Sequence, residues 1–155
     1  MKRGILVLVA LACVAAVAGA YFTQHRWGME PCPWCVLQRI LFLVIAAVAL
    51  MGAVIPKRWA QIAGSALVMP TAAGGIASAL YQHFVAAKSA SCNLTFADKV
   101  IGAFSLDARW PDMFEVRANC ADAATNLLGV PYEFWSLALF AMVAAAALWV
   151  IRSDA

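Results

Sequence analysis

Four long apolar runs dominate the pattern of hydrophobic and polar positions along the chain. They cover residues 4–22, 36–55, 60–82 and 134–151, and only the third contains an internal proline, Pro70. Each run is close to the roughly 20 residues that a helix needs to cross a bilayer. Backbone polar groups in lipid must hydrogen-bond within their own segment, so each run is predicted to be a helix. Small residues such as Gly64, Gly74 and Gly75 are typical of helices that approach closely in a membrane.

The runs predict an all-α fold, an integral membrane four-helix bundle that forms a single domain over residues 1–155. Composition supports the same class, because 65% of the residues are hydrophobic and only 12% are charged. Soluble domains average roughly 45–50% apolar and about 25% charged residues, so an ordinary soluble enzyme is excluded. The net charge of +3 is too small for the basic surface that nucleic-acid-binding proteins carry, so nucleic acid is not expected as a partner. The lipid bilayer is the predicted environment.

Positive charge predicts the orientation of the bundle, because cytoplasmic loops of membrane proteins carry an excess of lysine and arginine. The predicted outer loops cover residues 23–35, with Arg26 as the one lysine or arginine, and residues 83–133, with four basic and six acidic residues. Both termini are therefore predicted to be cytoplasmic and both loops extracytoplasmic. The basic residues that set this orientation are Lys2, Arg3, Lys57, Arg58 and Arg152.

A cleaved signal peptide is an alternative interpretation of the N-terminus. Lys2 and Arg3 precede an apolar stretch that contains a small-residue run at 18–20. The apolar run of residues 4–22 is longer than a usual signal core, which favours a retained helix. Cleavage would leave the sidedness of everything downstream unchanged.

Four of the five cysteines lie in the predicted outer loops. Cys32 and Cys35 form a CxxC motif in the short loop, Cys92 and Cys120 lie in the long loop, and Cys13 lies inside the first span. An even set on the extracytoplasmic side is typical of disulfides, for which four cysteines allow three pairings. Two structural disulfides remain an alternative to a redox function. The spacing of the second pair, without a partnering histidine, argues against zinc, so no metal is expected.

The CxxC motif favours redox chemistry. Cys35 precedes the second predicted span directly, where a helix N-terminus stabilises a thiolate. Arg39 follows four residues later, one helical turn along the same face. Its charge would stabilise the thiolate further, although an interface arginine that extends toward water is the alternative interpretation.

The run from Pro31 to Arg39, PCPWCVLQR, resembles the CxxC segment of the disulfide bond formation protein B (DsbB) family. The resemblance extends over the whole chain: four spans, a second cysteine pair in a long loop, and the segment Gly129-Val130-Pro131 before the fourth span. It implies a quinone-linked thiol oxidase of the bacterial inner membrane. Its implied partner is a periplasmic thioredoxin-like thiol oxidase, DsbA-like, and its implied electron acceptor is the membrane quinone pool, ubiquinone or menaquinone.

The resemblance also implies roles for individual residues. Cys32 and Cys35 match the pair in contact with quinone, with Cys35 nearest the ring. Cys92 and Cys120 match the second pair, in which Cys92 forms the mixed disulfide with the partner. Arg39 matches the arginine that assists quinone reduction.

His83, at the outer end of the third span, matches a histidine near the quinone. From the residues alone, a solvated helix-end histidine is the alternative. Two functional alternatives also stay open: a related quinone-linked oxidase for a dedicated substrate, and a membrane scaffold with structural disulfides.

The long loop is rich in apolar residues that alternate with charges. They favour a loop that lies on the membrane surface, or a small hydrophobic cluster that folds the loop, and both interpretations are compatible. Held near the membrane, Cys120 would come within reach of Cys32. The apolar residues are Phe96, Val100, Ile101, Phe104, Trp110, Phe114 and Val116.

Overall fold

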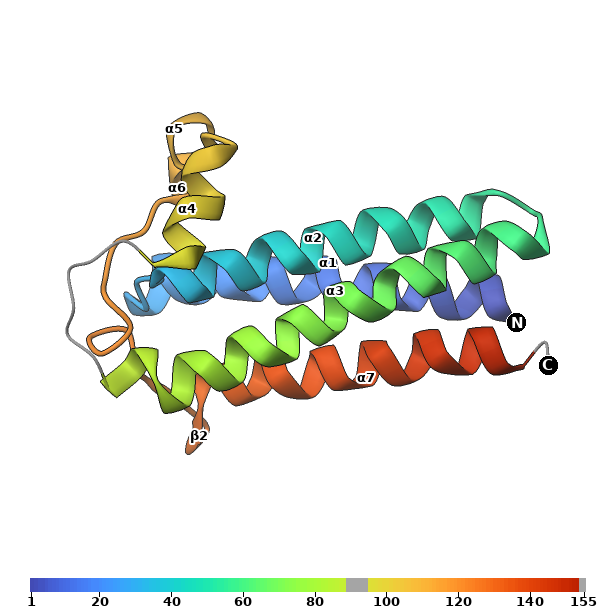
Figure 1. Cartoon of the computed structure of the whole chain (residues 1–155). Coiled ribbons are helices and arrows are strands. Elements are labelled where there is room, and N and C mark those ends of the chain that lie inside the picture. Colours follow the sequence, from blue (N-terminus) through green and yellow to red (C-terminus); the bar gives the residue numbers. More distant parts are fainter. Residues whose placement is uncertain (89–94, 154–155) are drawn as a thin grey trace.

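The computed structural model describes residues 1–88 and 95–153. Four long helices lie side by side, and both ends of the chain are at the same end of the bundle (Figure 1). All four are long and apolar enough to cross a membrane, which confirms the predicted four-helix membrane fold. They are α1 (Lys2–Trp27), α2 (Pro33–Val54), α3 (Arg58–Phe84) and α7 (Tyr132–Arg152).

Two helices extend into the predicted short loop. Helix α1 continues past residue 22 to Trp27 and ends where Gly28 takes a left-handed φ of 64°, a conformation that glycine adopts without strain. Helix α2 begins at Pro33, in a position where a missing N–H costs no helical bond. Residues 28–32 therefore form a short link, and Cys35 lies inside the first turn of α2.

Glycines allow the helices to approach closely at two levels of the bundle. A Cβ atom on Gly64 of α3 would lie 3.2 Å from the Cα atom of Gly52 of α2. At Gly75, a Cβ atom would overlap the ring of Phe140 in α7. By contrast, a Cβ atom on Gly74 would meet no described atom within 4 Å, so the prediction of a close approach there is wrong.

The segment between α3 and α7 is largely folded at the end of the bundle opposite the termini (Figure 1). It contains the 3-10 helix η1 (Ala86–Lys88), α4 (Phe96–Ala103), α5 (Leu106–Arg109) and α6 (Pro111–Phe114). The two short strands β1 (Asn126–Leu127) and β2 (Val130–Pro131) then pair antiparallel before α7. The side chain of Thr95 caps α4 by accepting from the backbone N–H of Asp98, whose carboxylate accepts from the N–H of Thr95.

The apolar residues of this segment differ in burial, and Val100 and Val116 are half-buried. Ile101 and Phe114 are buried against Val36 of α2, so a hydrophobic cluster does fold the segment onto the bundle. Three large apolar side chains instead remain mostly exposed, and their contact with a membrane surface stays a prediction. They are Phe96, Phe104 and Trp110.

Candidate dithiol site

The two cysteines of the CxxC motif are a reduced pair at the start of α2. Cys32 is the N-cap residue of the helix, in extended conformation, and its sulfur accepts a hydrogen bond from the backbone N–H of Cys35. The Sγ atoms of Cys32 and Cys35 are 3.1 Å apart, in thiol-to-thiol contact. The N-cap conformation turns the side chain of Cys32 back over the first turn, so the helix itself brings the pair together.

Cys120 from the long loop lies beside this pair. It packs in one buried cluster with Cys32 and Trp34, close enough for its thiol to contribute to the raised pKa of Cys32. Backbone contacts hold the two loops together, because the carbonyl of Pro31 accepts hydrogen bonds from the N–H groups of residues 117 and 118, at 3.1 and 3.3 Å. The tertiary structure therefore places a cysteine of the second pair against the first, as the sequence predicted. Cys92 lies outside the described residues.

The two thiols of the CxxC motif have different surroundings. Cys32 is fully buried, and burial, with a smaller contribution from its thiol contacts, raises the pKa of its thiol. Cys35 is partly exposed and lies on the wall of a cavity. Cys32 therefore keeps its proton at neutral pH and faces Cys120, while Cys35 faces the cavity.

This cavity has a volume of about 510 Å³ and lies between α1, α2, α7 and the two outer loops, which is within the range of small-molecule sites. Its outer end carries polar groups and its inner end is apolar. Along α7, for example, the lining runs from Tyr132 at the first residue to Met142, about 15 Å deeper along the helix. The polar lining residues near the outer end include Thr23, Gln38, Arg39, Gln82 and Tyr132.

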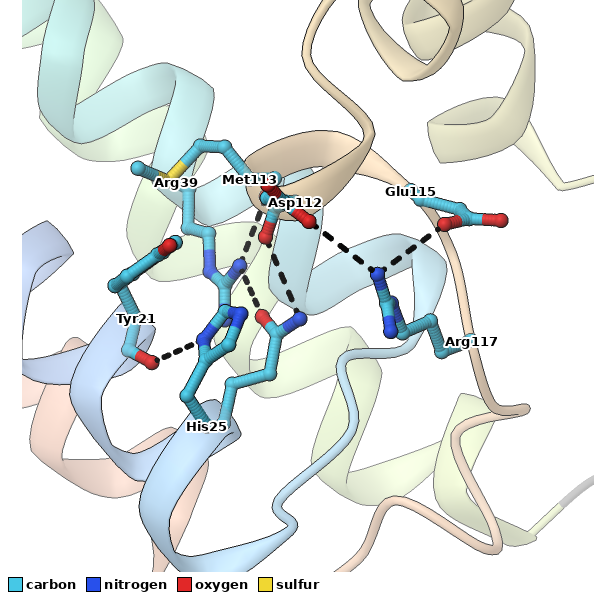
Figure 2. A network of polar contacts seen from close by, with 8 residues as sticks. Tyr21, His25, Arg39, Asp112, Met113, Glu115 and Arg117 are labelled. Carbon is cyan, nitrogen blue, oxygen red and sulfur yellow. Dashed lines mark hydrogen bonds and ion pairs between the residues drawn. The ribbon is translucent and has the colours of Figure 1, made fainter.

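Arg39 is buried in the cavity wall, where it connects three elements (Figure 2). One Nη donates 2.8 Å hydrogen bonds to Oε1 of Gln24 in α1 and to the carbonyl of Met113 in α6. The other Nη donates a longer bond of 3.4 Å to the carbonyl of Ala20. These bonds to described residues use three of the five N–H donors of a guanidinium. The head group lies inside the protein rather than in water, with donors left for a ligand in the cavity.

Two buried glutamines complete the wall next to Cys35. Nε2 of Gln82 in α3 donates to the Sγ of Cys35 at 3.2 Å. Oε1 of Gln82 accepts from Nε2 of Gln38 at 2.7 Å. The sequence analysis did not identify Gln24, Gln38 or Gln82 as site residues. Their signal was present, since each is an amide at the outer end of a long apolar helix, where a buried polar group needs a partner.

His83 pairs with an acidic side chain at the start of α7, and its predicted place near a quinone stays a prediction. Its Nδ1 is 2.5 Å from a carboxylate oxygen of Glu133, which is buried at the start of α7. Its ring also contacts Phe84 and Phe134. Among the described residues that line the cavity, Gln82 is present and His83 is not. The structure thus brings Cys32, Cys35, Cys120 and Arg39 together and places His83 outside that group.

Comparison with known proteins identifies the family. The model of the family "Disulfide bond formation protein DsbB" matches residues 2–150. The Disulfide bond formation protein B of Polaromonas naphthalenivorans is 34% identical over 152 residues, which are 96% of this chain and 90% of that protein. Disulfide bond formation protein B 1 of Pseudomonas putida is 33% identical over 144 residues, which cover 92% of this chain and 86% of that protein.

Proposed function

Because this chain belongs to the DsbB family, and is therefore a membrane protein of disulfide bond formation, we propose that it reoxidises a periplasmic thioredoxin-like thiol oxidase, DsbA-like, and passes the electrons to membrane quinone. One observation carries the proposal: the dithiol of Cys32 and Cys35 opens through Cys35 onto a cavity that is polar at its outer end and apolar within the bundle.

The residues of the cavity fit a quinone. A quinone has a polar ring and a long apolar tail, and supplies an acceptor for two electrons and two protons. The remaining donors of Arg39 would hold a ring oxygen next to Cys35, and the deeper lining, with Phe42, Leu139 and Met142, would surround the start of the tail. The arrangement fits either ubiquinone or menaquinone.

The relay through the cysteines is a series of two-electron exchanges, each by attack of a thiolate on a disulfide. The partner's dithiol reduces a disulfide of Cys92 and Cys120, and the partner leaves as a disulfide. The Cys120 thiolate attacks the sulfur of Cys32 in a Cys32–Cys35 disulfide and releases the Cys35 thiolate. Attack of Cys92 on Cys120 restores the second disulfide and releases Cys32.

This relay leaves Cys32 and Cys35 as a dithiol. Oxidation of Cys32 and Cys35 to a disulfide releases two electrons and two protons at the cavity. The raised pKa of Cys32 keeps one of these protons on its sulfur until that step. Arg39 stabilises negative charge at the outer end of the cavity.

The distribution of positive charge supports the proposed sidedness. The start of α1, the end of α7 and the α2–α3 turn lie at one end of the bundle, opposite α4 (Figure 1). Cys32 and Cys35 are at the start of α2, far from the α2–α3 turn. We place that end in the cytoplasm and the cysteine end in the periplasm, in the bacterial inner membrane. The five basic residues at the proposed cytoplasmic end are Lys2, Arg3, Lys57, Arg58 and Arg152.

The test is quinone reduction by the purified protein in proteoliposomes, with a reduced DsbA-like protein as the electron donor. Wild type should turn over with a short-chain ubiquinone or menaquinone analogue. Cys32→Ser and Cys35→Ser should abolish turnover, because each removes a sulfur that the relay needs, while Cys13→Ala should not. Near-normal turnover of either serine variant would refute the assignment of this pair. Quinone reduction by a small dithiol but not by the DsbA-like protein would indicate a dedicated substrate instead.

A further inference from the structure

We propose that Gln82, oriented by Gln38, is a positioning residue that holds the sulfur of Cys35 on the cavity wall through an N–H···S hydrogen bond. The inference deepens the proposed function, because it concerns how that site controls its reactive sulfur. It assigns a task to two buried amides that the cysteine relay and Arg39 leave without one.

In the structure the Gln82 amide faces Gln38 with its oxygen and Cys35 with its NH2 group. Gln38 and Gln82 are each 4% exposed, so water offers little alternative to their mutual contact. Gln38 donates through Nε2 to the carbonyl oxygen of Gln82, at 2.7 Å. The NH2 group of Gln82 is then directed to the other side, where the Cys35 sulfur accepts at 3.2 Å. Gln38 and Cys35 are both on α2, and Gln82 reaches them from α3.

The sulfur benefits from this donor most when it is an anion. A hydrogen bond with one ionised partner is roughly twice as strong as one between neutral groups. In the relay, Cys35 leaves as a thiolate when its disulfide with Cys32 is attacked, so Gln82 donates most strongly at that moment. Gln82 neither takes nor gives a proton, and its bond adds no charge to the membrane-embedded wall. The other groups that act on the Cys35 sulfur are the Cys32 thiol and N–H and the charge of Arg39.

Gln38 acts through Gln82 in this arrangement. Without the Gln38 donor, the Gln82 amide can turn its carbonyl oxygen toward the sulfur of Cys35. A carbonyl oxygen and a thiolate are both hydrogen-bond acceptors, so this orientation does not stabilise the ionised thiol. Loss of Gln38 should therefore weaken the same bond without removing it. A simple packing role for either glutamine predicts no such dependence of one residue on the other.

The experiment measures the alkylation rate of reduced Cys35 in the full-length protein, without quinone or partner, over about pH 6 to pH 10, since only the thiolate reacts. Peptide mass mapping separates Cys35 from the other cysteines. The variants are Gln82→Met, Gln38→Met and the double variant. Gln61→Met is the matched control, because Gln61 is on the same helix about 30 Å away along its axis.

Gln82→Met should lower the rate on the acidic side of the profile about tenfold, which corresponds to about 1.4 kcal/mol, and move the profile upward by about one pH unit. Gln38→Met should move it in the same direction by less. The double variant should match Gln82→Met, because Gln38 acts only through Gln82. Gln61→Met should overlay wild type.

A Gln82→Met profile that overlays wild type would overturn the proposal. Additive shifts in the double variant would overturn the orienting role of Gln38. If Gln82→Met fails to fold, judged by helicity and thermal unfolding, Gln82→Glu serves as the second variant. A carboxyl group lacks the NH2 group that donates to the sulfur, so a slower reaction supports the proposal and an unchanged rate refutes it. Since no quinone is present, these results do not depend on the test of the proposed function.

Discussion

Replacement of Arg39 by methionine tests the electrostatics of the site most directly. The side chain is 5% exposed, and its guanidinium lies among neutral hydrogen-bond acceptors, the amide of Gln24 and the carbonyl of Met113. Methionine fills a similar volume but removes the charge and all three hydrogen bonds. We expect slower quinone reduction and a slower reaction of the Cys35 thiolate, in a protein that still inserts and folds.

The size of the expected effect follows from the distance between the Arg39 charge and the Cys35 thiolate, which helix geometry sets. Arg39 is four residues after Cys35, a rise of about 6 Å along the axis. At an effective dielectric constant of about 20, two unit charges about 6 Å apart interact by roughly 2–3 kcal/mol. Because each 1.4 kcal/mol corresponds to a factor of ten, the expected loss is at least about tenfold in both rates. Arg39→Lys should recover only part of it, since an ammonium keeps the charge but lacks the planar fork that serves two acceptors at once.

The assay is quinone reduction across pH for wild type, Arg39→Lys and Arg39→Met, with the alkylation rate of Cys35 measured in parallel. Arg117→Met is the control. Arg117 follows α6 in the outer segment, close in sequence to Met113, but its side chain pairs with Asp112 and Glu115 at the surface, at 3.9 and 3.3 Å, where ion pairs contribute little. If Arg39→Met matches wild type and Arg117→Met in both rates, the charge of Arg39 has no part in the reaction.

Two further predictions concern the relay and the bundle. Cys120→Ser removes the thiol that resolves the mixed disulfide of Cys92, so the complex of Cys92 with the DsbA-like partner should accumulate. It would appear as a reducible band on non-reducing gels. A band formed through Cys32 instead would reverse the order of the two pairs. Gly75→Ala drives a methyl group into Phe140 and should lower the free energy of unfolding by about 1–3 kcal/mol. Gly74→Ala places its methyl group in open space and should leave the free energy of unfolding unchanged. Equal losses of stability at both positions would refute the packing argument.

The four spans and their class were determined by the sequence alone. A run of about 20 apolar residues has one stable outcome in lipid, because the backbone must satisfy its own hydrogen bonds. The local contact of Cys32 with Cys35 was also predictable, since an N-cap residue and the third residue of a helix are adjacent through the backbone. The prediction that Cys120 reaches Cys32 came from the apolar residues of the long loop, which favour a loop held at the membrane surface.

Only the tertiary structure decided which distant polar groups surround Cys35. Gln82 is 47 residues from Cys35, and Met113 is 74 residues from Arg39, so no periodicity within one helix predicts either contact. Their partners depend on the rotation and depth of each helix, which small residues such as Gly64 and Gly75 set by allowing close approach. The same packing pairs His83 with Glu133 rather than with the cavity. In an apolar bundle each buried amide or charge must find a partner, and helix packing determines which partner is within reach.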